Sequence, residues 1–183
     1  VRKKGYGDCK ALTNYMRTLL KAAGIKSYYC RIKDDRSVQK YDENFPKMFG
    51  NHVILMVPTE KGNIWLENTS QEIAFNHLNY TSLNRNVMAI SEDDIKLINT
   101  PTYKPEESSE ILNAVVQLNP DNSINVDAKF RFSGAQYDFQ MPLTTLNKDE
   151  VKEALKERFY YLNMENLEAN NVTNNRDEAL INY

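Results

Sequence analysis

The stretch Gly5-Tyr6-Gly7-Asp8-Cys9-Lys10 opens the segment that decides how the first part of this chain folds. Aspartate is a favoured N-cap residue, so a helix is expected to begin at Cys9. Apolar and aromatic residues then recur at spacings of three and four, at Leu12, Tyr15, Met16, Leu19, Leu20 and Ala23. This spacing predicts a helix with one buried face. Gly24 stands where such a helix is expected to stop.

Cys9 would lie in the first turn of this helix. The free N–H groups and the helix dipole there favour an anion, and therefore favour thiolate over thiol. That position is the physical setting of a nucleophilic cysteine. A lone cysteine in a helix is more often a small buried core residue, so the interpretation depends on partners elsewhere in the chain.

His52 and Glu67 are the partners that the sequence offers. The continuous apolar run Asn51–Pro58 predicts a strand that begins near His52, Thr59–Asn63 predicts a hairpin loop, and Ile64–Thr69 predicts the return strand. In an antiparallel hairpin His52 and Glu67 would be diagonal neighbours. A histidine that takes a thiol proton, oriented by a carboxylate, completes a catalytic triad.

Other residues of the first part receive structural interpretations. Ile25–Ile32, rich in Tyr and β-branched residues, predicts a strand, and Cys30 within it is expected in the core. Trp65 is expected in the core as well, and His77 in a surface or loop position. The polar stretch Lys33–Gly50 predicts a loop anchored by three residues, Phe45, Pro46 and Phe49.

The second part of the chain predicts a β-rich domain. Ser91–Ser109 has the composition of a linker, and the domain boundary is placed within it, at 101–109. Glu110–Leu118 predicts a strand, and a turn follows it. The clearest strand of the chain has alternating apolar residues, which predict one dry face: Ile124, Val126, Ala128, Phe130 and Phe132.

The last segments complete this second domain. Ala135–Met141 predicts another short strand after Gly134. A helix is expected to open at Asn147 or Lys148 and to reach Leu162. Leu167–Thr173 and Ala179–Tyr183 are interpreted as two further strands.

Composition sets bounds on function. The 183 residues are 41% hydrophobic and 26% charged, an ordinary globular balance. The net charge of −2 argues against a general nucleic-acid binder. Residues 1–100 contain 15 Lys and Arg against 11 Asp and Glu, whereas 101–183 contain 8 against 14, which favours two domains. No apolar run is long enough to predict a membrane span, and no Cys, His and carboxylate set has metal-site spacing, so neither a metal nor another cofactor is expected.

Three blocks, in this order, resemble the transglutaminase-like superfamily, whose core is papain-like. They are Gly5–Lys10 with its helix and Ala22-Ala23-Gly24-Ile25, then Asn51-His52-Val53-Ile54, then Trp65-Leu66-Glu67-Asn68-Thr69-Ser70. The later part is similar to the β-domain that follows this core in bacterial multidomain members. The resemblance implies an α+β fold, with a papain-like core of a helix packed on an antiparallel sheet and then a mainly β domain with one helix.

The resemblance also implies a domain division and residue roles. Residues 1–100 would be the core, lacking its N-terminal part; 101–109 the linker; and 110–183 the β-rich domain, cut short within a longer protein. Cys9 would be the nucleophile, His52 the general base and acid, and Glu67 the third member of the triad. The family usually has Asp followed by Pro at the third position, where this chain has Glu67-Asn68.

The implied activity is that of a cysteine acyl transferase or amide hydrolase, peptidase-like, which acts on peptide or protein amides through a thioester. One alternative is a catalytically weak or inactive member of the same class, used for binding or scaffolding. Another is an arylamine acetyltransferase-type enzyme, which shares the Cys-His-Asp order, although nothing in the sequence suggests a CoA site. Bacterial members imply a location in the cell envelope or periplasm, or export.

Overall fold

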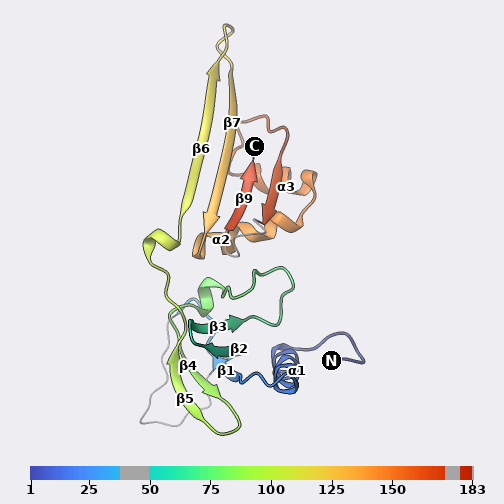
Figure 1. Cartoon of the computed structure of the whole chain (residues 1–183). Helices are drawn as coiled ribbons and strands as arrows, with labels where there is room; N and C mark the ends of the chain where they lie inside the picture. The colour runs from blue at the N-terminus through green and yellow to red at the C-terminus, as the bar shows by residue number, and fades with distance from the viewer. Residues whose placement is uncertain (38–49, 172–177, 183) are drawn as a thin grey trace. The chain divides into compact units, whose positions relative to one another are not determined.

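The computed structural model describes residues 1–37, 50–171 and 178–182 (Figure 1). They form two compact units, Val1–Thr102 and Tyr103–Tyr183. Each unit combines an antiparallel sheet with few helices, so the α+β class is confirmed. The expected aromatic anchors of the Lys33–Gly50 loop lie outside the described residues; they are Phe45, Pro46 and Phe49. In the part of the chain that the structure describes, every helix is too short or too polar to span a bilayer.

The first unit is built on a five-stranded antiparallel sheet in the order β3-β2-β1-β4-β5. Its strands are β1 (Tyr28–Ile32), β2 (His52–Thr59), β3 (Gly62–Leu66), β4 (Asn86–Ile90) and β5 (Ile95–Asn99). The core lies on the central strands, where Cys30 and Ile54 are completely buried. Trp65 on β3 is 2% exposed. The core positions predicted for Cys30 and Trp65 are therefore confirmed.

Strand β5 corrects the interpretation of Ser91–Ser109 as a linker. Its residues pair with β4 along their whole length, from Ile90 opposite Ile95 to Asn86 opposite Asn99. The acidic residues before it form a tight turn, in which the N–H of Ser91 donates to the carbonyl of Asp94 at 2.8 Å. A hairpin turn and a linker have the same polar composition, so composition alone could not distinguish the β4–β5 turn from a linker.

Helix α1 (Cys9–Ala22) begins and ends where the sequence predicts. Asp8 is the N-cap and accepts the N–H of Ala11 at 2.8 Å, and Gly24 follows with a positive φ of 73°. The predicted buried face is only partly correct. Of the helix residues, all of them described, Thr13 is the one fully buried, whereas Leu19 is 48% exposed. The helix packs on β2 and β1 along a narrow stripe, which leaves its outer apolar residues open to solvent.

The second unit contains a four-stranded antiparallel sheet in the order β6-β7-β9-β8. Its strands are β6 (Glu110–Leu118), β7 (Ile124–Ser133), β8 (Glu168–Asn171) and β9 (Glu178–Asn182). β6 and β7 form a long hairpin (Figure 1). Among the described residues, β9 pairs with β7 only along Lys129–Ser133.

The outer half of this hairpin corrects the prediction of a continuous dry face. Phe130 and Phe132 are 5% and 1% exposed, as an inward face requires. Ile124 and Val126 lie further out on β7 and are 53% and 36% exposed. The alternation of apolar and polar residues is therefore regular, but within the described part of the chain the packed layer covers the inner end of the strand, at Ala128, Phe130 and Phe132.

The helices of the second unit differ from expectation in number and length. Ala135–Gln140 forms α2, so the strand predicted over Ala135–Met141 is wrong. Gly134, with a φ of 56°, turns the chain, and Ser108 Oγ accepts the N–H of Ala135 at 3.1 Å, which starts a helix. α3 (Lys148–Leu155) begins at Lys148, one of the two expected starts, with Asn147 as its N-cap, but it ends before Leu162. The described residues of this unit thus form two α-helices where one was expected, together with the 3₁₀ turns η2 (Pro105–Glu107) and η3 (Met141–Thr145). The 3₁₀ turn η1 (Tyr80–Ser82) belongs to the first unit.

Candidate active site

The three predicted site residues come from three different elements of the first unit. Cys9 is the first residue of α1, His52 is the first residue of β2, and Glu67 directly follows β3. β2 and β3 are adjacent, with Leu55 opposite Leu66. This register places Glu67 diagonally across from His52, as the hairpin pattern predicts.

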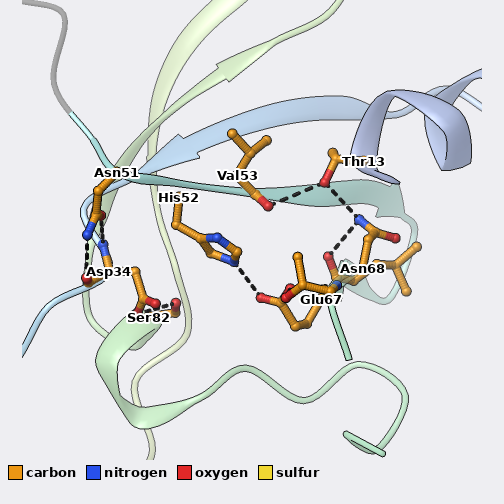
Figure 2. Close-up of polar contacts among 10 residues, drawn as sticks. Thr13, Asp34, Asn51, His52, Val53, Glu67, Asn68 and Ser82 are labelled. Carbon is orange, nitrogen blue, oxygen red and sulfur yellow. Dashed lines mark hydrogen bonds and ion pairs between the residues drawn. The ribbon is translucent and has the colours of Figure 1, made fainter. Parts of the chain in front are cut away.

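His52 and Glu67 are in direct contact. His52 Nε2 lies 2.7 Å from Glu67 Oε2 (Figure 2). Both side chains are largely buried, with 16% of His52 and 5% of Glu67 exposed. The second carboxylate oxygen, Oε1, accepts the N–H of Thr69 at 2.9 Å and its hydroxyl at 2.5 Å. One oxygen of Glu67 therefore contacts the imidazole and the other accepts two hydrogen bonds from Thr69, which holds the carboxylate in one orientation toward the imidazole.

The environment favours a charged imidazole. Burial alone would lower the pKa of His52, but the hydrogen bond and charge of Glu67 outweigh it, helped by a hydrogen bond with the Cys9 side chain and by the charge of Asp34. The net effect raises the pKa of His52 from 6.5 to about 9. Burial likewise would raise the pKa of Glu67, and the hydrogen bonds from His52 and Thr69 hold it below its usual 4.5. At neutral pH the pair is imidazolium and carboxylate.

Cys9 is partly exposed, and a hydrogen bond with its side chain is one of the influences that raise the pKa of His52. Since Glu67 takes Nε2 of the imidazole, Nδ1 is the ring nitrogen that remains for a thiol. An imidazolium between a carboxylate and a sulfur can stabilise a thiolate and later give up its proton to a leaving group.

Two residues that act on the candidate site were missed by the sequence reasoning. Burial raises the pKa of the Tyr29 hydroxyl on β1, and electrostatic interactions with Cys9 and Asp8 add to the rise, against the opposing charge of Arg31. Asp34 acts on His52 by its charge. A tyrosine and an aspartate near the ends of a strand carry no distinctive spacing, so no pattern in the sequence marks them.

His77 is not part of this arrangement. It lies in the loop between β3 and η1, as the expectation of a loop position allows, but it is completely buried rather than at the surface. Within the described ranges, no group of three or more His, Cys, Asp and Glu side chains is arranged to hold a metal ion.

Comparison with known proteins finds no family model, no curated protein and no solved structure that matches this chain. The fold and the candidate site are therefore defined by their own geometry. The first unit is an α+β unit with a cysteine at the start of a helix and a buried histidine–glutamate pair on one hairpin, the histidine at the start of β2 and the glutamate directly after β3.

Proposed function

We propose that the first unit is a transglutaminase-like cysteine acyl transferase or amide hydrolase with a papain-like core. The observation that carries the proposal is the 2.7 Å contact between His52 and Glu67, with Cys9 at the start of α1 as the other partner of the imidazole. A helix packed on an antiparallel sheet, with the histidine at the start of one strand and the acid directly after its neighbour, supports the proposal.

In the proposed reaction His52 holds the proton taken from the Cys9 thiol. The Cys9 thiolate attacks the carbonyl carbon of a peptide or protein amide, which forms a C–S bond and a tetrahedral oxyanion. The backbone N–H of Cys9 supplies one donor to that oxyanion. The C–N bond then breaks, and His52 gives its proton to the departing amine. A second amine or a water molecule, deprotonated by His52, attacks the thioester and releases Cys9.

Glu67 in place of aspartate is compatible with this role. Its extra methylene is accommodated, because the carboxylate reaches the imidazole and its other oxygen is fixed by Thr69. A shift of about 1 Å in such a contact can reduce a rate by about a hundredfold. The 2.7 Å separation argues that the longer side chain preserves the contact.

A second candidate is a catalytically weak or inactive module of the same class, used for binding. The observation in its favour is the outer half of the β6–β7 hairpin, where Val116 and Leu118 are 61% and 71% exposed. Exposed apolar surface of this kind often serves as a contact surface for another protein. This candidate keeps the fold and predicts no amide turnover.

The two candidates are separated by the reactivity of Cys9. We expect the alkylation rate of Cys9 by iodoacetamide to stay high well below the pH at which a free thiol titrates, about 8.5. His52→Ala should remove this low-pH reactivity, while Cys30→Ala, a change at a buried cysteine, should leave it intact. A rate that follows an ordinary thiol and ignores His52→Ala would contradict the enzyme proposal.

Turnover is the second arm of the test. A fluorogenic peptide amide, offered with and without a primary amine, distinguishes hydrolysis from transfer. Glu67→Asp is the matched variant for the departure at the third triad position. Turnover that rises in Glu67→Asp points to a weakened enzyme, and no turnover in either form, together with ordinary thiol reactivity, supports the binding module.

A further inference from the structure

A second set of hydrogen bonds ties together the three elements that carry the site. Thr13 Oγ1 donates to the carbonyl oxygen of Val53 at 3.3 Å. The hydroxyl oxygen of Thr13 in turn accepts an N–H of the Asn68 side chain at 3.2 Å, and Asn68 Nδ2 also lies 3.3 Å from the carbonyl oxygen of Leu66. Figure 2 shows these bonds beside the His52–Glu67 pair. Thr13 is completely buried.

Each member of this set is a close neighbour of a site residue in the chain. Thr13 lies four residues after Cys9, on the same face of α1 and one turn along it. Val53 follows His52, and Asn68 follows Glu67. A single hydroxyl group therefore connects the helix of the thiol with the strand of the imidazole and with the segment of the carboxylate.

The behaviour of Thr13 differs from that of an ordinary helical threonine. A threonine within a helix commonly donates to the carbonyl four residues earlier. Thr18 in the same helix does so, with its Oγ1 2.8 Å from the carbonyl oxygen of Asn14. Thr13 instead donates across to β2, 40 positions away in the chain. Its hydroxyl group therefore donates a hydrogen bond from α1 to β2 and not to the backbone of its own helix.

We propose that Thr13 and Asn68 are positioning residues that hold the Cys9 helix at its working distance from the His52–Glu67 pair. The inference rests on the proposed function and adds to it. The pair can keep its own contact without Thr13, because both of its members lie on one hairpin. The thiol lies on a separate element, α1, which packs on β2 and is hydrogen-bonded to the hairpin through this hydroxyl. A displacement of about 1 Å of one reacting group is enough to lower a rate by about a hundredfold.

Thr13→Val tests the proposal, because valine keeps the shape and removes the hydroxyl. We expect the low-pH alkylation rate of Cys9 to fall by between about tenfold and a hundredfold. Where the chain turns over an amide, kcat should fall while KM changes little. The pKa of His52, followed by NMR, should stay high, because the contact with Glu67 remains. Thr13→Ser, which keeps the hydroxyl, should restore the profile.

Thr18→Val is the matched control, since it removes a threonine hydroxyl from the same helix and touches neither strand. A purely structural role for Thr13 would lower the unfolding temperature and leave the pH profile of the folded protein unchanged. That outcome overturns the proposal. If Thr13→Val does not fold, Asn68→Ala carries the same test, because it removes only one of the bonds to Thr13.

The two proposals fail in different ways. If His52→Ala changes the alkylation profile and neither Thr13→Val nor Asn68→Ala does, the site stands and the positioning role is refuted. If His52→Ala changes nothing, the proposed function fails and the positioning role fails with it. A Thr13→Val/Asn68→Ala double variant should lose little more than Thr13→Val alone, because both act through one hydroxyl.

Discussion

Replacing Glu67 with glutamine should change how the stability of the first unit depends on pH. The substitution keeps the size of the side chain and removes the charge that, with its hydrogen bond, raises the pKa of His52 to about 9. In the unfolded chain the pKa of His52 returns to 6.5. A difference of this size between the folded and unfolded states corresponds to about 3 kcal/mol. Solvent screening reduces it little, because His52 is only 16% exposed.

The sign follows from which state holds the proton. Between pH 6.5 and about 9 the folded protein keeps the proton on His52 while the unfolded chain loses it. The stabilisation is therefore complete below pH 6.5 and is lost as the pH rises through about 9. On the acid side the pKa of Glu67 is lowered, so its contribution is present above 4.5 and is lost as the pH falls further. The loss at high pH and the loss at low pH both come from the single His52–Glu67 interaction, so its free energy is counted once.

The assay is denaturant unfolding of the wild type and Glu67→Gln at a series of pH values from 6 to 10. The difference in unfolding free energy should be largest near pH 6.5 and should shrink by about 3 kcal/mol above pH 9. Taking this difference removes the other titrating groups. Glu92→Gln is the control, because Glu92 is an exposed acid paired with Lys21. A difference that stays constant with pH, or a wild-type His52 that titrates near 6.5 by NMR, would refute the reasoning.

Three further outcomes are expected. Burial raises the pKa of Cys30 to about 12, so iodoacetamide at neutral pH should label Cys9 alone in the folded protein, and mass spectrometry that finds labelled Cys30 would contradict this. Gly134→Ala should destabilise the second unit by about 1–3 kcal/mol in denaturant unfolding, because the residue has a φ of 56° and a Cβ would lie 2.4 Å from the carbonyl oxygen of Glu107. Val116→Lys should reduce concentration-dependent association measured by light scattering, since Val116 is 61% exposed on a long edge strand; unchanged scattering would mean that this edge stays unpaired.

The sequence could predict those features of the site that depend on residues close together in the chain. Asp8 caps α1 through a bond to Ala11, three residues away, so the position of Cys9 follows from a short stretch. The contact between His52 and Glu67 follows from the register of one hairpin, whose strands are joined by a tight turn. In both cases the chain between the interacting groups is short and regular, which leaves few alternatives.

The errors of prediction fall where a segment is short and its partner is distant. Ala135–Gln140 alternates between polar and apolar residues like a strand, but Gly134 and the hydroxyl of Ser108 turn it into a helix. Ile95–Asn99 is a strand only because β4 offers an edge for it. A segment of five or six residues gains too little from its own propensity to determine its conformation, so tertiary contacts decide it.

Thr13 shows why a pattern of hydrophobic residues marks a helix more reliably than it marks a site. The periodicity of α1 selects Leu12 and Met16 as its buried positions, yet Thr13 is the residue that is completely buried. A buried hydroxyl is costly without partners, and its partners are Val53 and Asn68, 40 and 55 positions away. Burial at this point is decided by a hydrogen bond that only the folded chain can form. A polar residue one turn after a candidate nucleophile, inside an otherwise apolar stripe, is therefore the signal that the periodicity leaves out.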